Sequence, residues 1–244
     1  MKILEKLGKK NKDVYSVRPP VIACLGDSVT QGCFEIYQTS DVTLQTVFDQ
    51  SGAYHAHLKR ILGQMFPSAP INIINAGISG DNADNATGRL DRDVLSFSPD
   101  LVIICFGLND SASGENGVER YGNCMKKLVM RCKEAGAEVI IMTPNAVSDK
   151  LSPHVVNMGQ PFVKKCVEAN IKIYDDGVLD LYVEKARAVA KECGVPLCDV
   201  YAKWKALSAA GADLNDLLAN RVNHPTVAMN EFAAYALINT MLEN

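Results

Sequence analysis

Five short stretches along the chain have the length and character of buried strands. They are Val21–Leu25, Ile71–Asn75, Leu101–Phe106, Glu138–Met142 and Pro196–Val200. The third is apolar at every position, which is typical of a parallel strand that is buried on both faces of a sheet. Glycine, proline or asparagine follows several of these stretches, and such residues favour a turn where a strand ends. The pattern therefore predicts five strands.

Helix-like periodicity occupies the intervals between the predicted strands. Apolar residues recur at helical spacing over 52–66, 82–97, 118–135, 174–193 and 226–242. Regular alternation of strands and helices predicts an α/β fold with one parallel sheet, helices on both faces and right-handed connections. The length of 244 residues suits one such domain. We expect an N-terminal arm over 1–18, either amphipathic or loosely attached, and a single domain over 19–244.

Two long segments have no clean period and each follows a predicted strand. They cover 32–51 and 144–172. Loops of this length are uncommon in a compact domain unless they have a function. We expect both to be irregular, to overhang the carboxyl edge of the sheet, and to decide which substrate is accepted.

Charge and hydropathy exclude several functional classes. The net charge is −3 and the isoelectric point is about 5.8, so the chain lacks the basic surface expected of a nucleic-acid-binding protein. No apolar run approaches the roughly 20 residues of a membrane span. The first ten residues lack the apolar core of a signal peptide. The oligomeric state cannot be read from these patterns.

The eight cysteines indicate a reduced protein rather than a disulfide framework or a metal site. No two are spaced as Cys-x-x-Cys, and Cys24 and Cys105 lie inside predicted strands, where a free cysteine packs as a small apolar residue. We therefore expect a cytoplasmic protein. The four histidines are scattered, so no metal ion and no organic cofactor is expected.

Small polar residues at the strand ends supply the candidate chemistry. Ser28 follows the first strand directly after Gly26, where an abrupt turn would expose its hydroxyl as a nucleophile. His224 precedes Pro225 at the start of the last helix and could serve as general base. The backbone N–H groups of Ser28 and Gly80 and the side-chain amide of Asn109 could form an oxyanion hole. Each residue alone is as readily explained as a helix cap or turn former. Together they match acyl transfer.

Four blocks of this sequence resemble those of the SGNH (GDSL) hydrolase superfamily. The blocks are Gly26-Asp27-Ser28-Val29, Asn75 to Gly80, Gly107-Leu108-Asn109-Asp110 and His224-Pro225. The resemblance runs from about residue 21 to 240. It implies Ser28 and His224 as catalytic residues, with Gly80 and Asn109 at the oxyanion. It also implies a flavodoxin-like α/β/α sandwich with strand order 2-1-3-4-5.

The sequence departs from the family pattern at one position. The family places an aspartate three residues before the histidine, and this chain has Arg221 there. A guanidinium cannot accept the imidazole N–H, so another group must do so. Three alternatives are open: a backbone carbonyl near 220–222, an acid such as Asp199, Asp213 or Asp216, or a Ser–His dyad. We favour the carbonyl.

These observations predict a serine esterase that acts on a small-molecule ester with a small acyl group, with a carbohydrate O-acetyl ester as the first candidate. A lysophospholipase or thioesterase of the same family is the alternative among hydrolases. A non-catalytic module that binds a glycan or a partner is the alternative outside them, and Arg221 favours it. A nucleotide- or flavin-binding protein ranks well behind these, because the sequence has no Gly-x-Gly-x-x-Gly or Gly-Lys-[Ser/Thr] loop.

Overall fold

The computed structural model describes residues 1–41 and 43–244 and confirms the predicted α/β architecture. The main sheet has five parallel strands in the order β4-β1-β5-β6-β7, which is the predicted order 2-1-3-4-5 when these strands alone are counted along the chain. Their bounds are β1 Val21–Gly26, β4 Asn72–Gly77, β5 Leu101–Cys105, β6 Glu138–Met142 and β7 Leu197–Cys198.

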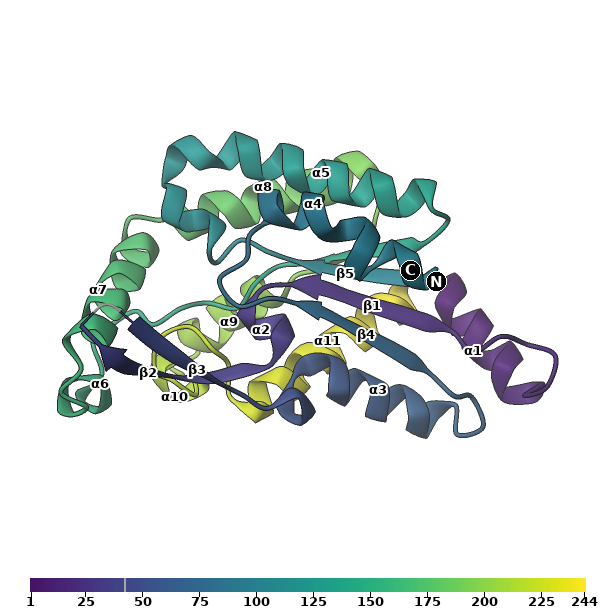
Figure 1. Ribbon diagram of the computed structural model, residues 1–244, viewed down its shortest axis with the longest axis horizontal. Coiled ribbons are helices and arrows are strands. Elements are labelled where there is room, and N and C mark those ends of the chain that lie inside the picture. The colour runs from purple at the N-terminus through teal and green to yellow at the C-terminus, as the bar shows by residue number, and fades with distance from the viewer. Residues whose placement is uncertain (42) are drawn as a thin grey trace.

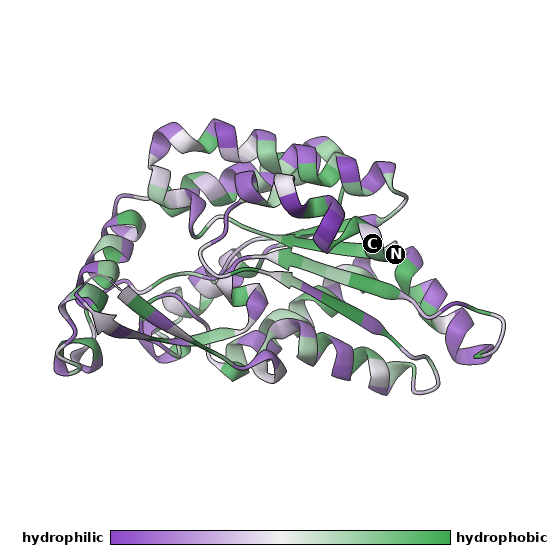
Figure 2. Cartoon of the chain, viewed as in Figure 1, coloured by the Kyte–Doolittle hydropathy of each residue, from purple (hydrophilic) through white to green (hydrophobic). Residues whose placement is uncertain are grey.

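Helices cover both faces of the sheet (Figure 1). One face carries α4 (Ala83–Asp93), α5 (Val118–Glu134) and α8 (Val178–Cys193), and the other carries α3 (Tyr54–Met65), α9 (Val200–Ala209) and α11 (Val227–Glu243). Successive residues of β1 serve opposite faces: Ile22 and Cys24 face one core, and Ala23 and Leu25 face the other. Strands β1 and β5 are accordingly mainly hydrophobic, whereas α4, α5 and α8 mix hydrophilic and hydrophobic residues (Figure 2).

The N-terminal segment is a packed amphipathic helix rather than a loose arm. Helix α1 (Lys2–Lys12) buries Ile3 and Leu7 completely in the core beside α3 and α11. The Glu138 carboxylate accepts hydrogen bonds from the backbone N–H groups of Lys2 and Ile3. The boundary expected at residue 18 stays a prediction.

Both segments expected to be irregular contain regular structure, so that expectation is wrong. The first contains an antiparallel hairpin of β2 (Cys33–Ser40) and β3 (Thr43–Phe48). The second contains α6 (Pro153–Asn157) and most of α7 (Pro161–Asp175). Position 42 of the first segment lies outside the described residues. Two further short helices are α2 (Ser28–Gln31) and α10 (Leu214–Leu217).

The hairpin and the helices α6 and α7 lie beyond the carboxyl ends of the strands (Figure 1). A small apolar cluster joins them to the segment that carries His224: Cys33 and Ile36 of β2 pack with Val155, Val163, Val167 and Val222. This cluster braces the loop on which the candidate base lies. Among the described residues, no helix is both long and apolar enough to cross a membrane.

Candidate active site

Ser28 lies on a sharp turn between β1 and α2. Asp27 caps α2 by accepting a hydrogen bond from the backbone N–H of Val29 at 3.0 Å. Ser28 is therefore the first residue of a short helix, and its own N–H has no acceptor among the described residues. The serine is 6% exposed. Its hydroxyl and its free N–H thus lie together at the edge of the sheet.

His224 approaches Ser28 from the loop before α11, as the sequence predicts. The His224 Nε2 atom is 2.9 Å from Ser28 Oγ, which is hydrogen-bonding distance. The loop is a tight turn in which the Ala219 N–H donates to the His224 carbonyl at 2.8 Å. Burial lowers the pKa of His224 to about 4, so its imidazole is neutral at neutral pH.

The Gly80 loop is positioned by Gln31 of α2. Gln31 Oε1 accepts the Ser79 N–H at 2.6 Å, and a Cβ on Gly77 would come within 2.2 Å of the Gln31 backbone nitrogen. Only glycine allows this close approach of β4 to α2. Gly80 has a φ of +78°, and its N–H has no acceptor among the described residues. The loop therefore offers a second free N–H.

Asn109 connects the third block to the Gly80 loop. Its side-chain Nδ2 donates to the Asp81 carbonyl at 2.8 Å, which uses one of the two amide hydrogens and leaves the other free. Asp110 strengthens this connection, because its carboxylate accepts the Gly107 N–H and the Ala83 N–H at 3.0 Å each. Its pKa is raised to about 6, mainly by burial. The second and third blocks thus form one hydrogen-bonded unit.

Arg89 of α4 is a residue that the sequence did not single out. Its buried guanidinium donates to the Gly26 carbonyl at 3.0 Å and to the Ala76 carbonyl at 2.7 Å. It also forms ion pairs with Asp81 at 2.5 Å and with Asp93 at 3.2 Å. Arg89 therefore ties the ends of β1 and β4 to the loop that carries Gly80.

Asp27 lies in this acidic surrounding and has a perturbed pKa. Its pKa is raised to about 7, mainly by burial; the hydrogen bond from the Val29 N–H opposes the rise, and the nearby charges of Asp110 and Asp81 add to it. Its carboxyl group therefore carries only part of its charge at neutral pH, which limits the negative charge beside Ser28.

The expectation that a backbone carbonyl accepts the His224 Nδ1 proton is wrong. The group beside Nδ1 is the side-chain Nδ2 of Asn220, at 2.8 Å. The three aspartates considered as substitutes are engaged elsewhere: Asp199 with Arg187, Asp213 with Lys150, and Asp216 with Arg221. The family spacing directs attention to residue 221, and the sequence has no signal that the side chain of residue 220 turns toward the ring.

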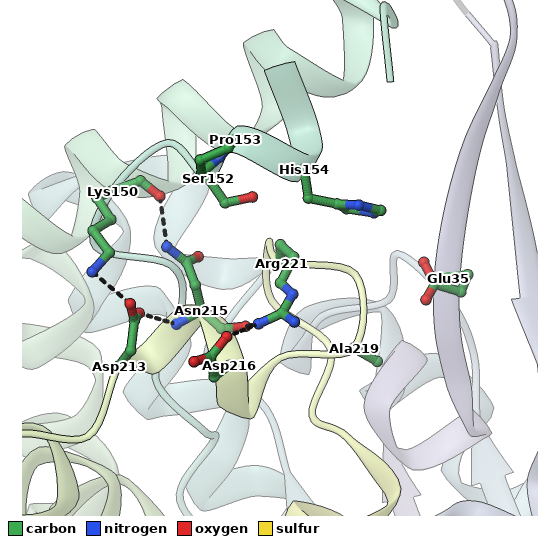
Figure 3. A pocket seen from close by; sticks show the side chains of 10 residues that line it. All are labelled: Glu35, Lys150, Ser152, Pro153, His154, Asp213, Asn215, Asp216, Ala219 and Arg221. Atoms are coloured by element: carbon green, nitrogen blue, oxygen red, sulfur yellow. Dashed lines mark hydrogen bonds and ion pairs between the residues drawn. The ribbon is translucent and has the colours of Figure 1, made fainter. Parts of the chain in front are cut away.

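The Arg221 side chain lines a polar cavity of about 400 Å³ (Figure 3). Its guanidinium binds the Asn215 carbonyl and the Asp216 carboxylate, and its backbone is in the left-handed region at φ +57°. Glu35 of β2 and His154 of α6 line the same cavity. Partial burial raises the pKa of Glu35, and electrostatic interactions with His154 and Arg221 oppose that rise. This charged cavity adjoins the loop that carries His224.

Comparison with known proteins extends over most of the chain. A family model described as the GDSL-like Lipase/Acylhydrolase family matches residues 24–232. An acetylxylan esterase of Geobacillus stearothermophilus is 28% identical over 100 residues, which are 37% of this chain and 46% of that protein. An arylesterase of Vibrio mimicus is 29% identical over 111 residues, covering 43% of this chain and 55% of that one. The chain spans about half the length of these curated relatives.

Solved structures match over a larger share of the chain. The crystal structure of an acetylxylan esterase from Geobacillus stearothermophilus has a TM-score of 0.65 at 21% identity, covering 91% of this chain and 94% of that one. A second acetyl xylan esterase structure has a TM-score of 0.64 at 21% identity, covering 90% and 98%. At this identity the likeness establishes a shared fold.

Proposed function

The chain belongs to the GDSL-like lipase/acylhydrolase family, and we propose that it hydrolyses carboxylic esters through an acyl-enzyme on Ser28. The observation that carries this proposal is the 2.9 Å contact between Ser28 Oγ and His224 Nε2. A nucleophile and a base at this distance, beside free N–H donors, are the elements of acyl transfer.

In the proposed reaction, Ser28 Oγ attacks the ester carbonyl while His224 Nε2 takes its proton. The N–H groups of Ser28 and Gly80 and the free amide hydrogen of Asn109 stabilise the oxyanion. His224 then gives the proton to the departing alcohol oxygen, which leaves the acyl group on Oγ. A water molecule, deprotonated by His224, attacks this acyl group, and the carboxylic acid is released as Oγ regains its proton.

Two observations support a small acyl group and a polar leaving group. Acetylxylan esterases are among the relatives and the solved structures that this chain resembles. The charged cavity at Glu35, His154 and Arg221 suits a leaving group rich in hydroxyls. We therefore propose an O-acetylated carbohydrate as the substrate class, in preference to a lysophospholipid or a thioester.

The non-catalytic alternative rests on a specific observation, namely that the group beside His224 Nδ1 is an amide rather than an acid. In that alternative the same cavity binds a glycan without turnover. The reduced, intracellular setting expected from the cysteines stays a prediction.

We expect the wild-type chain to hydrolyse p-nitrophenyl acetate and an O-acetylated methyl glycoside, and p-nitrophenyl decanoate far more slowly. Ser28→Ala should lower kcat/KM on the acetyl esters by about 10²-fold or more, because it removes the nucleophile. The measurement is initial rate against substrate concentration, with the buffer rate subtracted. Equal rates for wild type and Ser28→Ala would exclude the proposed mechanism and favour the binding module.

A further inference from the structure

The Asn220 side chain is held in one orientation by its surroundings. Its Oδ1 accepts hydrogen bonds from the backbone N–H groups of Val222, Asn223 and His224, each at 3.0 Å. Its Nδ2 donates to Asn223 Oδ1 at 3.1 Å. Turning the amide over would set its NH₂ group against three N–H donors, and all three hydrogen bonds would be lost. The orientation is therefore fixed by the loop itself.

In this orientation the Asn220 NH₂ group faces the His224 imidazole, and an amide NH₂ group can donate a hydrogen bond but cannot accept one. Asn220 Nδ2 lies 2.8 Å from His224 Nδ1, and both groups are buried. A neutral imidazole has one nitrogen that donates and one that accepts. Nδ1 can complete a hydrogen bond to Asn220 only as the acceptor, which leaves the ring proton on Nε2.

We infer that Asn220 is a positioning residue that holds His224 in the tautomer with its proton on Nε2 and thereby restrains the Ser28 nucleophile. The inference rests on the proposed function. In this tautomer Nε2–H donates to Ser28 Oγ across the 2.9 Å contact, so the nitrogen that should accept the serine proton is already occupied. Hydrolysis proceeds only through the minor tautomer. An amide in place of the acid costs a serine protease about 10⁴ in kcat for this reason.

The loop can accommodate an aspartate at position 220, which would shift the His224 proton away from Nε2. In Asn220→Asp, one carboxylate oxygen keeps the three backbone N–H donors, and the other takes the place of Nδ2 beside Nδ1. The Asn223 side chain already lies beside this position, because its Oδ1 accepts a hydrogen bond from Asn220 Nδ2. If the Asn223 amide turns over, its NH₂ group can donate to the new carboxylate oxygen. The ring proton then moves to Nδ1, and Nε2 becomes free to accept the serine proton.

The experiment combines a spectrum with kinetics on the full chain. Long-range ¹H–¹⁵N correlation of ¹⁵N-histidine-labelled protein at pH 7 should show the His224 proton on Nε2 in wild type and on Nδ1 in Asn220→Asp. His224→Gln identifies the signal among the four histidines. On p-nitrophenyl acetate, Asn220→Asp should raise kcat by at least about 10²-fold, toward 10⁴-fold, with little change in KM.

Asn223→Asp is the matched control, because it adds the same charge to the same loop without reaching His224 Nδ1. Its rise in kcat should be less than one tenth of the rise measured for Asn220→Asp. A wild-type His224 proton on Nδ1 would overturn the inference, whatever the rates. A switched tautomer without a rise in kcat would also overturn it. If no variant turned over any ester, the proposed function would fail, while an Nε2 proton in wild type would still support the tautomer assignment.

Discussion

In the Asn220→Asp background, Ser28→Ala is expected to lower kcat/KM by about 10⁶-fold, the cost of removing the nucleophile from a complete triad. In the wild-type background the same replacement should cost only about 10²-fold. The two Ser28→Ala effects differ by a factor of about 10⁴, which is the factor by which the Asn220 amide already lowers the activity of the wild type. The effects of Ser28 and Asn220 should therefore be strongly non-additive, as expected for residues that act as one unit.

This double-mutant cycle needs four proteins and one substrate: wild type, both single variants, and the double variant, with p-nitrophenyl acetate. Both chains that lack the serine should have the same low rate, because the histidine tautomer has no consequence without a nucleophile. If Asn220→Asp raised the rate equally in the Ser28→Ala background, the gain would come from another group on the protein.

Replacing Arg89 by methionine is expected to destabilise the fold by about 3–5 kcal/mol, the usual cost of leaving one partner of a buried ion pair without the other. Arg89 and Asp81 are 8% and 6% exposed, so the Asp81 charge would remain out of water without its partner. The carbonyls of Gly26 and Ala76 would each lose the hydrogen bond from the guanidinium as well. Urea unfolding should show a lower midpoint with an unchanged slope.

Arg92→Met in the same helix is the control for this loss of stability. The Arg92 side chain is 74% exposed, and its one ion-pair partner among the described residues is Asp93. Such a pair contributes about 0–1 kcal/mol, so the midpoint should hardly move. Equal effects at the two positions would show that the buried guanidinium does not hold the strand ends together.

The sheet could be predicted from the sequence because its central strands β1, β5 and β6 are buried on both faces. Residues such as Ile22 and Ala23 face opposite cores, so both must be apolar, and an uninterrupted apolar run results. The hairpin could not be predicted in the same way. Most of β3 is exposed, so burial imposes no apolar pattern on it. Helix α7 was missed for a similar reason, since only Val163 and Val167 are buried in it.

The residues at the strand ends could be found because a parallel sheet brings its carboxyl ends to one edge. This places Ser28 near the Gly80 loop and Asn109 without any knowledge of side-chain geometry. The partner of His224 Nδ1 depends instead on a tight loop, with Arg221 at positive φ and Asn220 folded over three N–H groups. No periodic pattern encodes such an arrangement, so the sequence gives no sign that the Asn220 side chain faces the imidazole.

Covalent labelling of Ser28 by a fluorophosphonate tests the central claim most directly. In this reaction an Oγ–P bond forms and fluoride leaves, so the adduct reports the nucleophile without turnover. We expect one adduct per chain on Ser28 by intact mass and peptide mapping, none on Ser28→Ala, and labelling of Asn220→Asp at least about 10²-fold faster than wild type. An adduct on another residue, or equal labelling rates for wild type and Asn220→Asp, would contradict a Ser28 nucleophile restrained by Asn220.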